Sequence, residues 1–399
     1  MSNWLLPWQE IVRFNKLTLD ERSVVFYSED AASRVHFAPI IEELLKAGQR
    51  ICYLTSAPSD PILTEQIPGL TSFYIGLGFS RTFLFSALWC KTLVMTMPDL
   101  HRYEIRRSLV HPVHYVYVFH TMVSTHMIYR EGAFNHYDTI LSVGPRHSRE
   151  IRATEAHYRL PAKILIDHGY GRLDSLLKNV KFRGRHENAV VLIAPSYGKN
   201  SLLEVCGVEL IRTLLAGGFQ VICRPHPITT ARSHTTMEAI RGEFLKNAGF
   251  RLETNVASED SLHESDLMIS DYSGAALEYA FGRLKPVLFI DVPKKVNNPN
   301  FEKIALTPIE VEIRSEVGGI LNPNELSKAC AVVRELFENS ESYANRIRMI
   351  REGLVAHLGE SGRIGCEAIL DILKRQGPAP IHGQRSSAPI ASKNAENSR

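Results

Sequence analysis

Short apolar segments alternate with amphipathic or polar segments along most of the chain, and this alternation constrains the fold more than any other feature. The apolar segments are rich in Val, Ile and Leu, which is typical of buried strands. They are 24–27, 51–54, 92–95, 116–119, 139–143 and 164–166, then 190–195, 221–223, 267–269 and 287–290. Apolar strands that alternate with helices predict an α/β protein with mostly parallel sheets covered on both faces.

The polar and basic segment 178–188 interrupts the alternation and shows no apolar periodicity, so we interpret it as a linker. A chain of 399 residues is also long for one domain. We therefore predict two Rossmann-like domains, 1–177 and 189–376, whose sheets face each other across a cleft. The second domain is expected to end with a helical stretch, 326–374. The segment 377–399 is rich in Pro, Ser, Ala and Asn and is expected to be disordered.

The composition is that of an ordinary soluble globular protein. Hydrophobic residues make up 44% and charged residues 22% of the sequence, and no run of about 18 uncharged apolar residues occurs that would span a bilayer. A net charge of +3 is too small to indicate nucleic acid, and no nucleic-acid-binding motif is present. The six cysteines form no CxxC pair, so we expect reduced core thiols. With no signal peptide at the start, we expect a cytoplasmic protein.

An aromatic region near the N-terminus leaves contact with a membrane surface open. The chain starts with Trp4-Leu5-Leu6-Pro7-Trp8, and the segment 73–97 interleaves aromatic and basic side chains. These are Phe79, Phe83, Phe85 and Trp89, with Arg81 and Lys91. The pattern suits a helix at the lipid–water interface, which would make the protein peripheral at the inner face of the plasma membrane. The alternative, the commoner use of such a pattern, is a core helix followed by the buried strand 92–95.

Histidines follow three of the predicted strands: His120, His168 and His226. The carboxyl ends of parallel strands line the ligand crevice of such sheets. A histidine there can act as a general base near neutral pH, or hold a phosphate as a cation. His120 and His226 lie in turns of separate domains and are the predicted catalytic residues. His126 is interpreted either as functional or as a capping or packing residue.

A strand–turn–helix unit in the second half has the form of an anion site. The strand 267–269 leads into the polar turn Asp271-Tyr272-Ser273-Gly274, and a helix begins at once over 275–281. Small residues at such a turn direct free N–H groups and the positive end of the helix dipole at one point. Together with Arg224-Pro225-His226-Pro227 after strand 221–223, this unit predicts a site for a phosphorylated ligand.

Two further side chains are candidates for ligand contact. Ser196 lies in a Ser/Gly turn after a predicted strand, where it can touch a nucleotide or a phosphate. Glu278 lies one turn into the helix, where it either accepts hydrogen bonds from ribose hydroxyls or complements the helix dipole. The chain has no GxxxxGK[ST], HExxH or GxSxG motif and no carboxylate cluster spaced for a metal, so no cofactor and no required metal is predicted.

The order of these motifs resembles the CDP-glycerol glycerophosphotransferase family, which primes and polymerises teichoic-acid-type polymers. The resemblance covers roughly residues 110–300. His120-Thr121 resembles the family's His-Gly turn, and 169–174 is similar to its Pro-Arg-x-Asp element. Residues 224–227 fit its Arg-x-His-Pro turn, and 271–274 with Glu278 looks like its Asp-Tyr-Ser-Ser turn and the acid after it. Thr121, Gly171 and Gly274 depart from the family's Gly, Pro and Ser at these positions.

The resemblance implies a GT-B fold with an acceptor domain followed by a nucleotide-donor-binding domain. It implies transfer of glycerol phosphate, or a related alditol phosphate, from a CDP-linked donor to a hydroxyl of a lipid-linked or glycan acceptor, with release of CMP. His120 would be the general base, His226 would bind the diphosphate, and Glu278 would hold the ribose. The other implied donor-binding residues are Ser196, Arg224, Asp271, Tyr272, Ser273 and Gly274.

Three alternative functions remain open at this point. One is a GT-B glycosyltransferase that uses a CMP- or UDP-sugar, since His-Pro and Ser-rich phosphate turns suit that reaction too. Another is a nucleotide-sugar epimerase of the same architecture, which needs no acceptor. The third is a non-catalytic relative that binds a nucleotide or scaffolds partner enzymes, because fold alone does not determine function.

Overall fold

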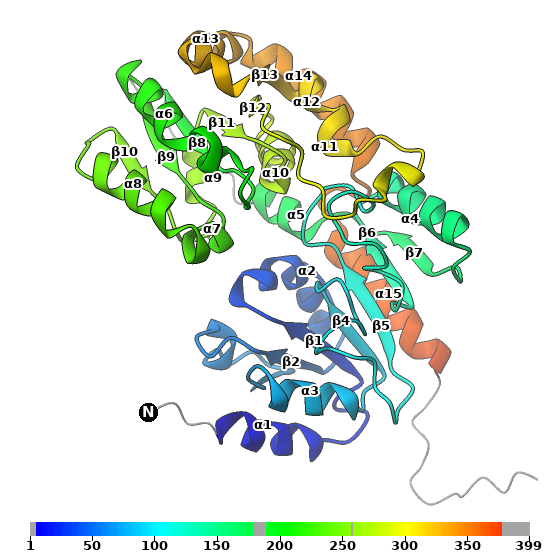
Figure 1. Ribbon diagram of the computed structural model, residues 1–399. Coiled ribbons are helices and arrows are strands. Elements are labelled where there is room, and N and C mark those ends of the chain that lie inside the picture. Colours follow the sequence, from blue (N-terminus) through cyan, green and yellow to red (C-terminus); the bar gives the residue numbers. More distant parts are fainter. Residues whose placement is uncertain (1–4, 179–188, 257, 377–399) are drawn as a thin grey trace, which may run out of the picture.

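The computed structural model describes residues 5–178, 189–256 and 258–376, and these residues form two α/β units, each built on its own sheet (Figure 1). Every strand pairing in both sheets is parallel, which confirms the predicted fold class. Most of the predicted linker and the whole predicted tail, together with Trp4, lie outside the described residues.

The first sheet has seven strands in the order β3-β2-β1-β4-β5-β6-β7. They are β1 (Val24–Ser28), β2 (Ile51–Thr55), β3 (Leu70–Tyr74), β4 (Thr92–Met95), β5 (His114–Val118), β6 (Thr139–Ser142) and β7 (Ile164–Asp167). Its helices are α1 (Leu6–Asn15), α2 (Arg34–Lys46), α3 (Phe79–Ser86), α4 (Pro145–Tyr158) and α5 (Gly171–Lys178). Because β1 pairs with β2 on one side and β4 on the other, the strand order reverses beside β1, where such sheets bind ligands.

The second sheet has six strands in the order β10-β9-β8-β11-β12-β13. They are β8 (Val190–Ile193), β9 (Gln220–Cys223), β10 (Phe250–Leu252), β11 (Leu267–Ser270), β12 (Val287–Ile290) and β13 (Gly318–Leu321). Its helices are α6 (Leu202–Ala216), α7 (Pro227–Arg232), α8 (His234–Phe244), α9 (Asp260–Glu264), α10 (Gly274–Arg283), α11 (Ile309–Glu312), α12 (Arg314–Val317) and α13 (Ala329–Glu338). Here the order reverses between β8 and β11.

Three strands were not predicted from the sequence, namely β3, β10 and β13. β3 lies at a sheet edge and buries only Phe73 fully, and β10 has three residues. β13 begins with Gly318-Gly319, which do not favour a strand in sequence. A Cβ at Gly318 would overlap the backbone of Val287 on β12. The glycine therefore allows a close approach that only the assembled sheet requires.

The last helix returns to the first domain, which differs from the predicted grouping. After α13, α14 (Ser340–Leu354) contacts α10 and α12 of the second unit, and α15 (Ser361–Gln376) packs along α2 (Figure 1). Gly362 and Gly365 lie so close to Pro39 and Ile40 of α2 that a Cβ on either would clash. The final helix therefore belongs to the first domain, because its glycine face fits a helix more than 300 residues earlier in the chain.

The aromatic segment 73–97 divides into a buried and an exposed part. Strand β4 is fully buried, as the core interpretation predicts. On α3, Phe85 is fully buried, whereas Phe79 and Phe83 are 77% and 49% exposed. In the three described ranges, no helix has both the length and the apolar character needed to cross a bilayer. All six cysteines are free, and only Cys330 is not fully buried.

Candidate active site

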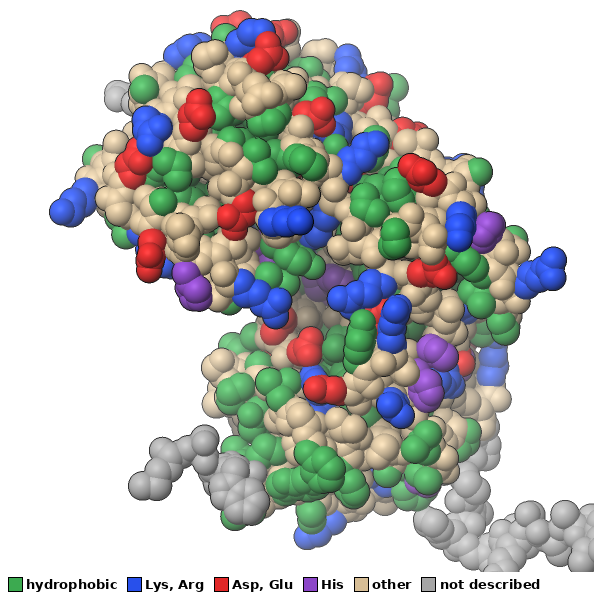
Figure 2. Space-filling model, in the orientation of Figure 1, with side chains coloured by type: hydrophobic (Ala, Val, Ile, Leu, Met, Phe, Trp, Pro, Cys, Tyr) green, Lys and Arg blue, Asp and Glu red, His purple; other side chains and the backbone are tan. Residues whose placement is uncertain are grey.

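A cleft of about 540 Å³ lies between the carboxyl ends of the two sheets. Figure 2 shows it as a hollow between the two halves of the molecule, with basic side chains at its rim. From the first domain it is lined by the turns after β1, β4 and β5, and from the second by those after β8, β9 and β11. The site is therefore built where the strand order of each sheet reverses, which is where open parallel sheets bind ligands.

The cleft brings together all the predicted site residues except Asp271. Those that line it are His120, Ser196, Arg224, His226, Tyr272, Ser273, Gly274 and Glu278. They come from four separate turns that are up to 158 residues apart in the sequence. These residues converge because the carboxyl ends of parallel strands lie at one edge of a sheet, as the sequence analysis assumed.

His120 follows β5 on the first-domain wall and is half-buried. Its Nδ1 lies 3.2 Å from the Tyr117 hydroxyl. Burial lowers the pKa of His120 to about 4, although the Thr96 carbonyl and Asp30 favour the protonated form. The imidazole is therefore neutral near pH 7, which is the state in which it can accept a proton.

His226 lies on the opposite wall and has a structural role as well. Its Nδ1 accepts a hydrogen bond of 3.1 Å from the Ile228 N–H and so caps α7. Because Nδ1 is the acceptor, the neutral ring carries its proton on Nε2. Burial, and then Lys295, lower the pKa of His226 to about 4. His226 is therefore a neutral hydrogen-bond donor in the free protein rather than the cation that the sequence suggested as one option.

The predicted anion turn forms the N-terminus of α10. Ser273 is the N-cap, and its Oγ accepts from the Ala275 N–H at 3.3 Å. Asp271 is 1% exposed and does not line the cleft. Its carboxylate accepts from the Ser196 N–H at 2.7 Å and from the Leu202 N–H at 2.9 Å. Asp271 therefore fixes the turn that carries Ser196 to the start of α6, and its predicted contact with the ligand is corrected to a positioning role.

Glu278 and Arg224 line the cleft with most of their polar atoms already in use. Glu278 accepts from the Tyr170 hydroxyl at 2.6 Å and from Arg172 Nε at 2.8 Å. Arg224 donates to Ser261 Oγ at 2.8 Å and to the Val256 carbonyl at 2.7 Å. Burial lowers the pKa of Arg224 to about 10, so it stays a cation near neutral pH. Both side chains therefore fix the walls of the cleft through these hydrogen bonds, and both contribute a charge to its lining.

Lys295 and Arg172 also line the cleft, and neither is among the site residues predicted from the sequence. Arg172 lies in the segment 169–174 that resembles the family's Pro-Arg-x-Asp element. Lys295 follows β12, and its Nζ lies 3.4 Å from the centre of the Tyr197 ring. Burial lowers the pKa of Lys295 to about 8, although Asp271 favours the charged form. The signal was present, since Lys294-Lys295 follow a predicted strand.

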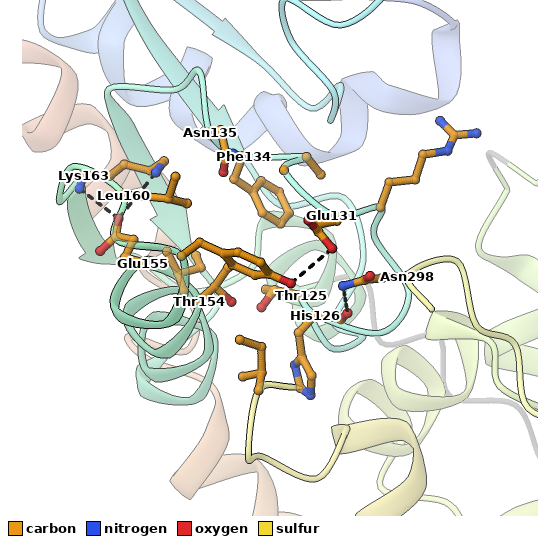
Figure 3. A pocket seen from close by; sticks show the side chains of 16 residues that line it. Thr125, His126, Glu131, Phe134, Asn135, Thr154, Glu155, Leu160, Lys163 and Asn298 are labelled. Carbon is orange, nitrogen blue, oxygen red and sulfur yellow. Dashed lines mark hydrogen bonds and ion pairs between the residues drawn. The ribbon is translucent and has the colours of Figure 1, made fainter. Parts of the chain in front are cut away.

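The two other histidines considered from the sequence lie elsewhere. His168 is fully buried and donates from Nδ1 to the Ser142 carbonyl at 3.0 Å. His126 donates from Nε2 to the Leu306 carbonyl at 2.9 Å. It lies beside a separate cavity of about 30 Å³ near α4 (Figure 3), which is room for little more than water. Both are packing residues, as the alternative interpretation of His126 states.

Among the described residues, no three His, Cys, Asp or Glu side chains converge as ligands for a metal ion. The cleft is lined by three acidic residues, Asp30, Asp99 and Glu278, and by a group of cations that suits an anionic ligand. Arg130, Arg172, Arg224 and Lys295 line it, together with the N-terminus of α10. Such an arrangement can bind a diphosphate and place a neutral histidine beside it.

The comparisons with known proteins agree with this geometry. A family model described as CDP-glycerol:poly(glycerophosphate) glycerophosphotransferase matches residues 120–294, a range that contains every site residue predicted from the sequence. No curated protein sequence matches the chain.

Solved structures share the two-domain architecture at low sequence identity. The wall teichoic acid polymerase TagF gives a TM-score of 0.56 at 12% identity, over 93% of this chain and 95% of that chain. A putative UDP-N-acetylglucosamine 2-epimerase from Listeria monocytogenes gives 0.56 at 14% identity, over 88% and 96%. MnaA of S. aureus, solved with UDP, gives 0.56 at 11% identity, over 88% and 96%. Identities this low show the fold alone, and the function rests on the family match. The chain has a GT-B fold and is a CDP-glycerol glycerophosphotransferase-like enzyme.

Proposed function

We propose that the chain transfers glycerol phosphate, or a related alditol phosphate, from a CDP-linked donor to an acceptor hydroxyl and releases CMP. One observation carries the proposal. His120 of the first domain shares a cleft with His226 and the N-terminus of α10 of the second. A base and an anion site from different domains suit a reaction between two substrates. The TagF-like fold supports a role in making a teichoic-acid-type polymer of the cell surface.

The second domain supplies the groups that would hold the donor. The Gly274 N–H, Ser273, the Nε2–H of His226 and the Lys295 ammonium surround the position proposed for the diphosphate. Glu278 has lone pairs left on both carboxylate oxygens after its contacts with Tyr170 and Arg172, so it can still accept from ribose hydroxyls. The donor would then lie along α10, with its diphosphate at the positive end of the helix.

The reaction is a displacement at the phosphorus nearer the glycerol. His120 takes the proton of the acceptor hydroxyl as the acceptor oxygen forms its bond to that phosphorus. The bond from that phosphorus to the oxygen bridging the two phosphates breaks, and CMP leaves with the electron pair. Lys295 would neutralise the charge that develops on the departing phosphate, and the neutral His226 would donate a hydrogen bond to it from Nε2. Positioning and charge neutralisation supply most of the rate enhancement in such reactions.

A second cavity supports a glycan or lipid-linked acceptor on the first-domain side. It measures about 400 Å³ and shares Pro98 and Asp99 with the cleft. Its apolar wall is formed by Met95, Met97, Leu100, Tyr103 and Ile105. Its polar wall holds Glu29 and Glu104, which pair with the buried Arg81. Apolar surface beside carboxylate acceptors suits a molecule that has both hydroxyl groups and an apolar face.

An exposed apolar surface supports a cytoplasmic enzyme that works at the inner face of the plasma membrane. On α1 and α3, Trp8 packs against Phe79 and Phe83, with ring centres 5.9 and 5.6 Å apart. The neighbouring exposed side chains are Leu5, Leu6, Val12 and Leu77.

Sedimentation with vesicles tests whether this apolar surface contacts a membrane. The double variant Phe79→Ser/Phe83→Ser should lose this contact, and Met349→Ser should not, because Met349 is 71% exposed on the other domain. Equal sedimentation of all three proteins would reject membrane contact.

The reaction is tested by CMP release from CDP-glycerol, with and without membrane extract as acceptor. We expect acceptor-dependent release, which falls at least about 10²-fold in His120→Ala because a positioned base contributes that much or more. Binding of CDP-glycerol should persist in this variant. Failure of the unaltered protein to bind CDP-glycerol would reject the donor and favour CMP- or UDP-sugars. Binding with no release in the presence of acceptor would favour a non-catalytic role.

A further inference from the structure

Thr121 of the first domain occupies the space that a side chain at position 274 of the second domain would need. Gly274 is the first residue of α10. A Cβ atom on Gly274 would overlap the Thr121 hydroxyl oxygen, and would lie 3.2 Å from Thr121 Cβ and 3.5 Å from Val123 Cγ1. The loop after β5 therefore closes directly onto the N-terminus of α10, and only glycine fits beneath it.

This contact is held by buried hydrogen bonds on the same loop. The Ser124 N–H and hydroxyl donate to the two oxygens of Glu310 at 2.9 and 2.6 Å. The Thr125 N–H donates to Glu150 at 2.7 Å. From the second domain, the Asn298 amide donates to the His126 carbonyl at 2.9 Å. The position of Thr121 over α10 is therefore fixed by contacts on both sides of the domain boundary.

The Thr121 hydroxyl faces the cleft in a setting that suits an anion. Thr121 and Gly274 both line the cleft, and within the described part of the chain the Thr121 hydroxyl makes no hydrogen bond. It lies next to His120 in the sequence and beside the first free N–H groups of α10. A hydroxyl added to a helix N-terminus gives an oxyanion one more donor.

We propose that the Thr121 hydroxyl donates a hydrogen bond to the donor phosphate that is transferred. The assignment rests on the proposed function. His120 takes the proton of the acceptor hydroxyl, whose oxygen attacks the phosphorus nearer the glycerol. Because Thr121 adjoins His120, it contacts that phosphate and not the one that stays with cytidine. The first domain thus completes the donor site, and Thr121 supplies from across the cleft the hydroxyl for which position 274 has no room.

The first test separates the hydroxyl from the bulk of the side chain. Thr121→Val keeps the shape and removes the donor, whereas Thr121→Ser keeps the donor. We expect CDP-glycerol and CDP to bind about 10-fold more weakly or worse to Thr121→Val, as for a lost hydrogen bond to a charged group. CMP lacks the second phosphate, so its affinity should not change. Thr121→Ser should restore most of the binding. The measurement is isothermal titration calorimetry with the three nucleotides.

The second test examines the shared space without using activity. Gly274→Ser should lower the melting temperature because its side chain overlaps Thr121, and Thr121→Gly should have a smaller effect. The double variant Thr121→Gly/Gly274→Ser should recover stability relative to Gly274→Ser, so the two changes should not be additive. Additive melting temperatures, or a Gly274→Ser variant as stable as the unaltered chain, would overturn the steric relationship.

The outcomes distinguish this inference from the proposed function. If the unaltered protein binds CDP-glycerol and Thr121→Val binds it equally well, the phosphate contact is wrong while the function stands. If Thr121→Val weakens CMP as much as CDP-glycerol, the hydroxyl contacts the wrong phosphate and the assignment fails. If the unaltered protein binds none of the three nucleotides, the donor itself is wrong, and the assignment falls with the proposed function.

Discussion

Arg172 at the start of α5 and Glu278 on α10 form an ion pair across the domain boundary, with Nε and Oε2 2.8 Å apart. Their side chains are 11% and 9% exposed, and the Tyr170 hydroxyl donates to the other oxygen of Glu278. The Glu278 carboxylate, which the sequence suggested for ribose binding, therefore also links the two domains through this ion pair and hydrogen bond. Substitutions at Glu278 will report on both roles, so its partner has to be altered in parallel.

Removing Arg172 should destabilise the whole chain. Arg172→Ala leaves the buried Glu278 carboxylate without its cation, which costs about 3–5 kcal/mol for pairs of this kind. Tyr170→Phe removes one neutral donor and should cost about 1–2 kcal/mol. Urea unfolding at neutral pH measures both. A loss below about 1 kcal/mol in Arg172→Ala would show that water replaces the pair, as it does for surface ion pairs.

The two roles of His226 can be separated by substitution. Asparagine is a good N-cap, so His226→Asn should keep the start of α7 while losing the Nε2 donor. His226→Ala should lose both and cost about 1 kcal/mol more in unfolding free energy. We expect both variants to bind CDP-glycerol about 10-fold more weakly. If His226→Asn binds as tightly as the unaltered protein, His226 acts on the turn alone.

Lys295 should make donor binding depend on pH. Its pKa is about 8 in the free protein, so the ammonium is present below that pH and lost above it. The affinity for CDP-glycerol should fall above about pH 8, by up to about 10-fold per pH unit. Lys295→Met should bind weakly throughout and lack this fall. Lys294→Met is the matched control, because Lys294 is exposed and does not line the cleft. A fall above pH 8 that persists in Lys295→Met would assign it to another group.

His168 should make the stability depend on pH in the acidic range. Burial lowers the pKa of His168 from 6.5 to about 4, and its Nε2 has no partner in the described structure. Between these values the unfolded chain binds a proton that the folded chain does not, so stability falls as the pH falls. For His168 alone the loss approaches about 3 kcal/mol.

The control for this effect is His168→Asn, which keeps a donor for the Ser142 carbonyl but cannot titrate. It should be less stable than the unaltered protein near neutral pH because it leaves a cavity. The difference in unfolding free energy between the two proteins should shrink as the pH falls below about 6.5, since only one of them has the histidine. A difference that stays constant down to about pH 4 would contradict the buried, neutral histidine.

The sequence determined the parallel sheets and most of the cleft. Buried strands are recognisable in the sequence as short apolar segments, and the carboxyl ends of parallel strands share one edge of the sheet. His120, Ser196 and His226 were therefore predicted as site residues from the local pattern and this one topological rule. Glu278 and the turn 271–274 followed from the start of a helix after a strand. None of these steps required knowledge of distant contacts.

Tertiary structure alone decided what each polar side chain touches. Asp271 has the same local setting as Ser273, yet it turns inward to the N–H groups of Ser196 and Leu202. The place of α15 on α2 and of Thr121 over Gly274 depends on segments more than 150 residues apart. Such contacts arise because close packing matches shapes that are distant in sequence. The sequence therefore determined that the site lies at the carboxyl edges of the two sheets. Packing between the two domains decided which side chains line the cleft there.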